Sequence, residues 1–282
     1  MTLVRATKDM PSYQRGFARS AGEALYPGLW RGLVGAWMPS LGPSGGQLFD
    51  VSGYGNHGAL TNMEVSIDWI PTEKGYALDF DGSNEFVGVQ TWPADSLSVT
   101  NQFSFVLLVR IDTSSVGTND YLYLRHPSDT GKQHAIIVGF VDDAVEFFST
   151  GFTGSDPRTG SQISVPDNTS IHQYAYTYNG STWTGYLDGI EVFSTSRTFS
   201  LAPTIHATPT CSIFSSGAAN YCDGAMVSFS IHNRALSPQE IRQLYIDPMA
   251  LVRTRRQLFG MAQIVAAGTI IPIIMAHGRR RR

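Results

Sequence analysis

Charged side chains are scarce in this 282-residue sequence: they make up 15% of it, against about 25% in an ordinary soluble domain. Cysteine occurs only twice, which excludes a zinc site built on cysteine ligands and allows at most one disulfide. Lysine occurs three times, so arginine supplies 17 of the 20 basic residues. With 42% hydrophobic residues the chain can form a large core, which excludes a disordered protein and a disulfide-held miniprotein.

The first residues lack the features of a secretory signal, because they contain no apolar run and no small-residue cleavage site. We therefore expect folding in a reducing cytosol. Disulfides are rare there, so Cys211 and Cys222 are expected to be two thiols.

Charge divides the chain into three regions. Residues 1–31 carry five basic and two acidic side chains, and residues 248–282 carry seven arginines and no acid. Residues 32–247 carry eight basic and twenty-one acidic side chains, a net charge of −13. We expect a basic N-terminal arm (1–31), a domain (32–247) and an apolar, arginine-rich C-terminal arm (248–282).

Short apolar runs separated by Gly, Asn, Asp, Ser and Pro fill residues 32–236, a pattern typical of a β-sandwich or barrel. Two hairpin turns, Asn179-Gly180 and Asp188-Gly189, predict a three-stranded meander over residues 174–193. Two-residue turns would pair Tyr176 with Trp183 and would place Ile190 and Val192 on its core face.

Two further elements are predicted outside the meander. Residues 103–109 predict a central strand with both faces covered. Residues 237–240, Ser-Pro-Gln-Glu, form a capping box that predicts one short helix before Pro248.

Four stretches together resemble the laminin G-like, concanavalin A-like jelly-roll domains. They are Leu-Val-Gly-Ala-Trp at 33–37 with the D-x-S-G-x-G-N-x-G loop at 50–58, Ala-Leu-Asp-Phe-Asp-Gly at 77–82, the meander at 174–189, and His-Asn-Arg-Ala-Leu-Ser at 232–237. The resemblance implies an all-β, two-sheet antiparallel sandwich with one short C-terminal helix and extended terminal arms. The motif residues with a structural role are then Asp50, Gly53, Asn56, Gly58, Asp188 and Gly189.

Many relatives carry acidic residues just before the closing motif, and in some members these help to hold calcium. Val227 and Ser228 stand at those positions here. Calcium takes six to eight oxygen ligands, so we expect no metal and no cofactor. Asp50 and Asn56 are instead interpreted as turn-forming residues.

No catalytic motif is present. Glycosidases of this fold need two carboxylates across the scissile bond, and the E-x-D-x-x-E pattern of the family's catalytic members is missing. Asp142, Asp143 and Glu146 are interpreted as a solvated strand edge. Tyr186 and Phe193, on the predicted outer face of the meander, could stack on a sugar ring or be covered by a neighbouring loop or subunit.

The C-terminal region contains twenty uncharged residues, 257–276, between groups of arginines. This length could span a bilayer, but polar residues and Pro272 interrupt it, so we favour docking onto protein. The terminal arginines suit carboxylate or phosphate, including nucleic acid. The expected partner-binding residues are Trp30, Phe259, Ile264, Ile270, Ile271, Arg279, Arg280, Arg281 and Arg282.

The opening segment, residues 25–37, is also similar to versions of this domain in tailed-phage structural proteins. We therefore expect a non-enzymatic structural protein of the virion, on head or tail, held to other subunits by its arms, with homo-oligomers expected. The alternative is a carbohydrate-binding module that recognises a glycan. A glycoside hydrolase is the third hypothesis, which the missing carboxylate motif disfavours.

Overall fold

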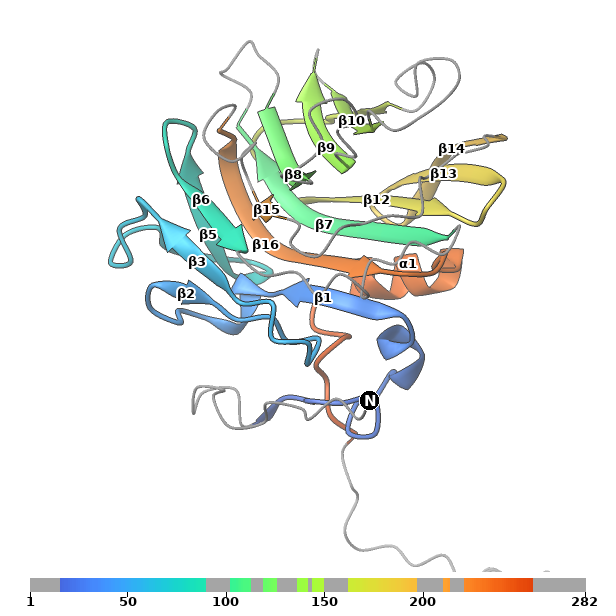
Figure 1. Cartoon of the computed structure of the whole chain (residues 1–282), viewed down its shortest axis with the longest axis horizontal. Helices are drawn as coiled ribbons and strands as arrows, with labels where there is room; N and C mark the ends of the chain where they lie inside the picture. The colour runs from blue at the N-terminus through green and yellow to red at the C-terminus, as the bar shows by residue number, and fades with distance from the viewer. Residues whose placement is uncertain are drawn as a thin grey trace, which may run out of the picture.

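The computed structural model describes residues 16–89, 102–112, 119–125, 136–141, 144–149, 162–196, 210–213 and 221–255. Within them two antiparallel sheets lie face to face, and one short α-helix lies beside them (Figure 1). This confirms the expected all-β sandwich.

The first sheet contains eight strands. Seven follow one another in the order β14-β13-β12-β7-β16-β5-β4, and β1 also pairs with β16. The strands are β1 (Leu33–Trp37), β4 (Trp69–Thr72), β5 (Gly75–Asp81), β7 (Phe103–Ile111), β12 (His172–Tyr178), β13 (Thr182–Leu187), β14 (Ile190–Ser196) and β16 (Asp223–His232).

The second sheet has the order β11-β10-β9-β8-β15-β6-β3-β2. Its strands are β2 (Gln47–Leu48), β3 (Gly58–Thr61), β6 (Phe86–Val89), β8 (Asn119–Arg125), β9 (Ile136–Val141), β10 (Ala144–Ser149), β11 (Ile163–Ser164) and β15 (Thr210–Ile213).

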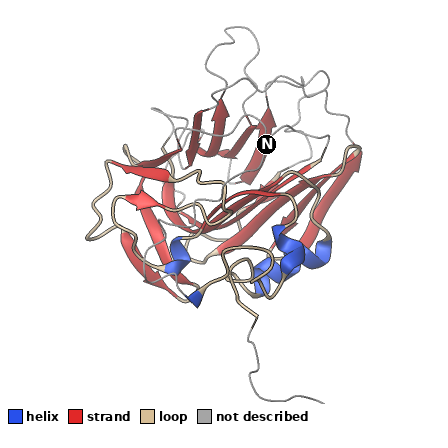
Figure 2. Cartoon of the chain, turned by 60° about the horizontal axis from the view of Figure 1, so that its bottom comes forward, coloured by secondary structure: helices blue, strands red, loops and turns tan. Residues whose placement is uncertain are grey.

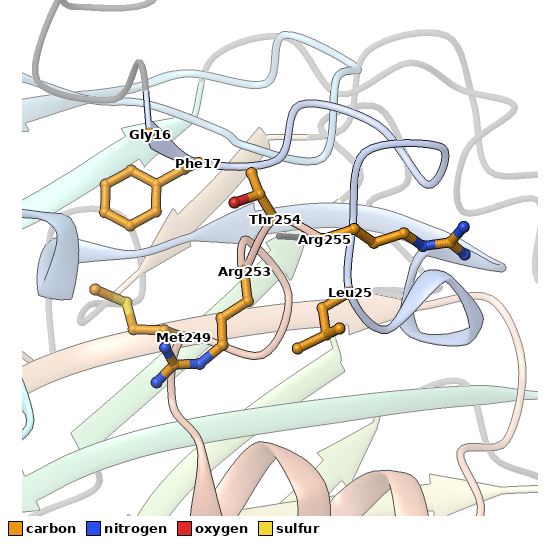
Figure 3. A pocket seen from close by; sticks show the side chains of 7 residues that line it. All are labelled: Gly16, Phe17, Leu25, Met249, Arg253, Thr254 and Arg255. Carbon is orange, nitrogen blue, oxygen red and sulfur yellow. The ribbon is translucent and has the colours of Figure 1, made fainter. Parts of the chain in front are cut away.

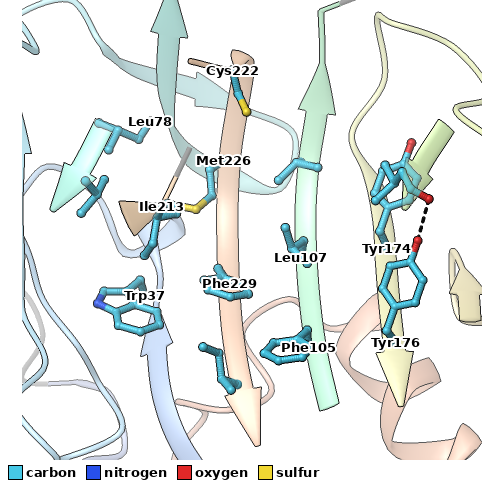
Figure 4. Packing of buried hydrophobic residues seen from close by; sticks show 14 of the residues in the cluster. Trp37, Leu78, Phe105, Leu107, Tyr174, Tyr176, Ile213, Cys222, Met226 and Phe229 are labelled. Atoms are coloured by element: carbon cyan, nitrogen blue, oxygen red, sulfur yellow. Dashed lines mark hydrogen bonds between the residues drawn. The ribbon is translucent and has the colours of Figure 1, made fainter. Parts of the chain in front are cut away.

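The main core fills the space between the sheets. β7 and β16 form the middle of the first sheet, and Phe105, Leu107 and Phe229 point from them into this core (Figure 4). Trp37 of β1 stacks on Phe229, with ring centroids 5.6 Å apart. β7 is almost wholly buried along its length, which confirms that it is a central strand.

A second apolar cluster covers the outer face of the first sheet. The helix α1 (Pro238–Ile246) contributes Ile241 and Leu244. The segments before β1 and after α1 contribute Leu29, Leu251 and Val252. The helical segments lie on one side of the sandwich (Figure 2). The described residues of both expected arms thus pack onto the domain and onto each other.

The two terminal segments are joined by main-chain hydrogen bonds. Ala18 N donates to Val252 O over 2.7 Å, and Leu25 N donates to Arg253 O over 2.7 Å. Residues 16–31 and 248–255 are called the terminal layer below.

The meander forms as predicted, with two corrections. Tyr178, not Tyr176, pairs with Trp183, because the Asn179 side chain accepts hydrogen bonds from Ser181 and Thr182 and so lengthens the turn. The register also shifts between Gly185 and Tyr186. Val192 is the extra residue of this bulge, and Ile190 still pairs with Leu187. The two side chains are 47% and 62% exposed, respectively, instead of buried.

Cys222 is buried in the main core. Cys211 lies on β15, and its side chain is outside the described part of the chain. In the segments that the structure describes, no helix has the length and apolar character needed to cross a membrane. Residues 257–276, on which the membrane alternative rested, lie outside those segments.

Candidate functional site

Asp50 organises the loop between β2 and β3, where the D-x-S-G-x-G-N-x-G motif lies. Its Oδ1 accepts hydrogen bonds from Ala36 N and Ser52 N, each 2.9 Å long. Its Oδ2 accepts from Ser52 Oγ at 2.7 Å and from Asn56 N at 3.0 Å. Burial raises the pKa of Asp50, while these hydrogen bonds act in the opposite direction. The carboxylate is therefore a buried structural acceptor, as the turn-forming interpretation requires.

Asn56 fastens the same loop to β1. Its Nδ2 donates to Val34 O over 3.2 Å, and Trp37 Nε1 donates to Asn56 O over 2.8 Å. Gly53 has a φ of 90°, which side chains other than glycine rarely adopt. A Cβ on Gly58 would lie 2.2 Å from Val87 Cγ1, so glycine is required for β3 to approach β6. The loop conformation is thus fixed before any ligand arrives.

This rigid loop carries aromatic side chains at its surface. Tyr54 is 44% exposed, and the rings of Phe49 and His57 meet edge to face with centroids 5.0 Å apart. His57 Nδ1 accepts a hydrogen bond from Asp50 N over 3.1 Å, so the neutral ring carries its hydrogen on Nε2. The loop offers ring surface and one oriented N–H donor, a combination that suits a ligand with apolar faces and acceptor oxygens. We call Phe49, Tyr54 and His57 the loop aromatics.

Sequence reasoning missed Phe49 and Tyr54 as candidate contacts, although it identified the motif around them. The available signal was an aromatic residue between two glycines, Gly53-Tyr54-Gly55, in a segment already interpreted as a turn.

The two expected glycan contacts lie elsewhere. Tyr186 is 4% exposed and packs in the outer cluster with Ile241 and Leu244 of α1. Of the two alternatives for Tyr186, the structure therefore has this side chain covered instead of open to a sugar ring. Phe193 packs partly buried against the main core, its ring centroid 6.2 Å from that of Tyr176. The bulge in the meander places Phe193 on the inner face instead of the outer one.

Asp188 and Gly189 form the predicted β13–β14 turn, with φ values of 51° and 75°. Asp188 also holds His172, whose Nδ1 lies 2.8 Å from Asp188 Oδ2. Asp167 Oδ2 lies 3.2 Å from His172 Nε2. Burial opposes protonation, but the two carboxylates together raise the pKa of His172. This arrangement ties together the segments on which these residues lie.

Trp30 bonds within the chain. Its Nε1 donates to Leu251 O over 2.6 Å, and its ring packs partly buried against the outer cluster. The other expected partner contacts, Phe259, Ile264, Ile270, Ile271 and Arg279 to Arg282, lie outside the described residues. The same holds for Asp142 and Asp143 and for the side chain of Glu146.

Most described carboxylates near the sheets have a structural partner. Arg110 of β7 binds Asp112 at 2.7 Å and Asp79 at 3.1 Å. Glu85 differs in its pKa. Burial raises the pKa of Glu85 to about 7, although the hydrogen bond from Asp81 N acts in the opposite direction. Sequence reasoning missed Glu85, because its burial depends on the tertiary fold.

No group of three or more His, Cys, Asp or Glu side chains in the described segments could hold a metal ion. Val227, at a position where relatives carry acids, is fully buried.

The fold and the site define a two-sheet jelly-roll domain with a preformed aromatic surface loop. A family model described as the concanavalin A-like lectin/glucanases superfamily (Laminin_G_3) matches residues 81–242. The match covers more than half of the chain, which therefore belongs to this superfamily.

Several solved structures are similar in fold. The Trypanosoma rangeli sialidase in complex with the inhibitor DANA has a TM-score of 0.55 and 17% identity, and the match covers 76% of this chain and 32% of that one. The same sialidase with sialic acid has a TM-score of 0.54 and 17% identity, covering 78% and 33%. This chain thus spans about a third of the sialidase.

A third similar structure is a separate domain. Domain 4 of AbnA, a GH43 extracellular arabinanase from Geobacillus stearothermophilus, was solved in complex with arabinotriose. Its TM-score is 0.55 with 18% identity, and the match covers 76% of this chain and 98% of the domain. No curated protein is significantly similar to this sequence.

These findings correct the expected function. The family and the similar structures concern carbohydrate-related proteins, a sialidase and an arabinanase domain, and show no role in a phage particle. The expectation of a virion structural protein is wrong. The expected location in a virion and the contacts with other virion subunits depended on that role.

Proposed function

We propose that this chain is a non-catalytic carbohydrate-binding domain whose contact surface includes the loop aromatics. The observation that carries the proposal is the preformed loop, which Asp50 and Asn56 fix and which carries the exposed Tyr54 and the half-buried His57. A rigid site binds without first paying an ordering cost. Family membership and the arabinotriose complex of the similar domain support a neutral oligosaccharide as the ligand.

Binding without hydrolysis is favoured by how the described carboxylates are used. Hydrolysis of a glycosidic bond needs an acid and a second carboxylate on either side of it. Asp50 is saturated by four donors, and Glu240 is bound to Arg234. Asp167 shares His172 with Asp188, and Glu85 accepts a hydrogen bond from Asp81 N. Incubation of the protein with arabinotriose should therefore release no arabinose, as measured by chromatography.

The binding test uses arabinotriose and isothermal titration calorimetry. We expect the Tyr54→Ala variant to bind about tenfold more weakly, because an aromatic contact contributes about 0.5–1.5 kcal/mol beyond its area. The matched control is Tyr76→Ala, since Tyr76 is 40% exposed but lies on β5, outside the loop. Equal weakening by both substitutions, or by neither, would contradict the assignment of the loop.

Glycan binding should not depend on calcium. Asp50 already accepts hydrogen bonds on both carboxylate oxygens, and Val227 and Ser228 replace acids found in relatives. We expect the arabinotriose affinity to be the same in EDTA and in millimolar calcium. A loss of binding in EDTA that calcium restores would refute this expectation.

A further inference from the structure

A pocket of about 790 Å³ opens in the terminal layer, between residues 16–25 and residues 249–255. Its size lies within the range of small-molecule sites. The apolar side chains that line it are those of Phe17, Leu25 and Met249 (Figure 3). Two arginines, Arg253 and Arg255, also line it, together with Gly16 and Thr254.

Both walls of this pocket are fixed by the main chain. Leu25 N donates to Arg253 O, and Arg255 N donates to Glu23 O over 3.0 Å. Phe17 and Met249 also pack against the outer cluster. The outer cluster therefore holds the side chains of Phe17 and Met249 in place.

The two guanidinium groups are anchored through their Nε atoms. Arg253 Nε donates to the Asp247 carboxylate, and Arg255 Nε donates to Ala24 O over 3.1 Å. The side chains extend in opposite directions from Thr254, and that of Arg253 lies on the same side as Phe17 and Met249 (Figure 3). Arg253 remains 53% exposed although it is paired, so its terminal nitrogens are available to a second anion.

The charge of the rest of the chain indicates what this pocket attracts. Residues 1–15 contain three basic and one acidic residue, and residues 256–282 contain five arginines and no acid. These segments carry the same sign of charge as the two arginines that line the pocket. A complementary occupant is an external anion.

We propose that this pocket binds a small amphipathic carboxylate, with the carboxylate on Arg253 and an apolar body against Phe17 and Met249. Arginine pairs with carboxylates in a fork geometry that lysine lacks. The apolar lining beside Arg253 favours a ligand with a hydrocarbon body over a purely polar anion. This site is separate from the loop aromatics and does not depend on the proposed glycan binding.

The test titrates the full chain with octanoate, octanamide and acetate by calorimetry. Octanoate should bind at least tenfold more tightly than octanamide, which lacks the charge, and than acetate, which lacks the body. Lengthening the ligand from hexanoate to octanoate should tighten binding by up to about fourfold per CH₂. The Arg253→Gln variant should bind octanoate at least fivefold more weakly, and Arg253→Lys should be intermediate.

The matched control is Arg242→Gln, which removes an exposed arginine from α1, away from the pocket lining. It should bind octanoate as the unmodified chain does. Equal binding of octanoate and octanamide, equal effects of Arg253→Gln and Arg242→Gln, or no saturable octanoate binding would each overturn the proposal. The ligand comparison on the unmodified chain decides the question even where Arg253→Gln does not fold.

Discussion

At the scale of single residues, Asp50 and His232 are both buried ionisable side chains, but burial affects them differently. Asp50 is 1% exposed and accepts four hydrogen bonds, so its burial is compensated by donors. His232 is fully buried, and burial together with the charge of Arg234 lowers its pKa to about 3. Protonation of His232 in the folded protein is therefore strongly disfavoured.

The lowered pKa of His232 predicts that the free energy of unfolding decreases at acid pH. The folded pKa of His232 lies below the unfolded value of 6.5, so the unfolded chain takes up a proton first as the pH falls. The contribution of His232 is intact above pH 6.5 and should decrease by about 2 kcal/mol between pH 7 and pH 5. Urea unfolding at both pH values would measure it, and His232→Leu should show a smaller loss.

The useful control for His232 is His172, whose pKa is raised instead of lowered. Its stabilising contribution is present at low pH and decreases as the pH rises through the folded pKa, so His172→Gln should not reduce the acid sensitivity. An unchanged loss of stability in His232→Leu between pH 7 and pH 5 would show that another group causes it.

At the scale of elements, the helix α1 depends on one carboxylate. Glu240 accepts hydrogen bonds from Ser237 N at 2.9 Å and from Arg234 Nη2 at 2.6 Å. Burial acts in the opposite direction, but the hydrogen bonds from Arg234 and Ser237 lower the pKa of Glu240 to about 2. The helix that covers Tyr186 is thus fixed at its start by a capping box and an ion pair together.

We expect Glu240→Gln to reduce the free energy of unfolding by roughly 2 kcal/mol at pH 7. The folded pKa is below the unfolded value of 4.5, so this contribution is full above pH 4.5 and decreases as the pH falls toward 2. Chemical denaturation at pH 7 and pH 3 should show a smaller difference at pH 3. Glu73→Gln, at an exposed position, serves as the control; a pH-independent difference would contradict the prediction.

The elements also show what could be predicted from the sequence. The Asp188-Gly189 turn, the central strand β7 and the capped helix depend on local patterns, and all three form as predicted. The Asn179 loop and the bulge at Gly185 could not be predicted, because they depend on side-chain hydrogen bonds and on the Phe193 ring that covers Gly185.

The candidate site was only half predictable for the same reason. The roles of Asp50, Asn56 and the glycines follow from turn chemistry. The exposure of Tyr54 and the contact between Phe49 and His57 depend on how the loop docks on β1, through Val34 and Trp37. Whether Tyr186 is exposed or covered could not be predicted, because its cover comes from α1, which begins 52 residues further along the chain.

At the scale of the whole molecule, the two apolar clusters differ in where their residues come from. Every member of the main core lies within residues 32–247. The outer cluster combines that region with Leu29, Ala250, Leu251 and Val252 of the terminal layer. The terminal layer is therefore part of the packing, while the sandwich has a complete core without it.

This division predicts the behaviour of shortened chains. Residues 32–247 should fold with a cooperative transition and an all-β circular-dichroism spectrum, because the main core is retained. Loss of the terminal layer removes Leu29, Leu251 and Val252 from the outer cluster, and each buried aliphatic side chain contributes about 1.5–3 kcal/mol. Relative to residues 16–255, the shorter chain should therefore melt at least about 10 °C lower. Equal melting temperatures of 32–247 and 16–255 would show that the terminal layer contributes no stability, and a non-cooperative product from 32–247 would show that the sandwich cannot form without it.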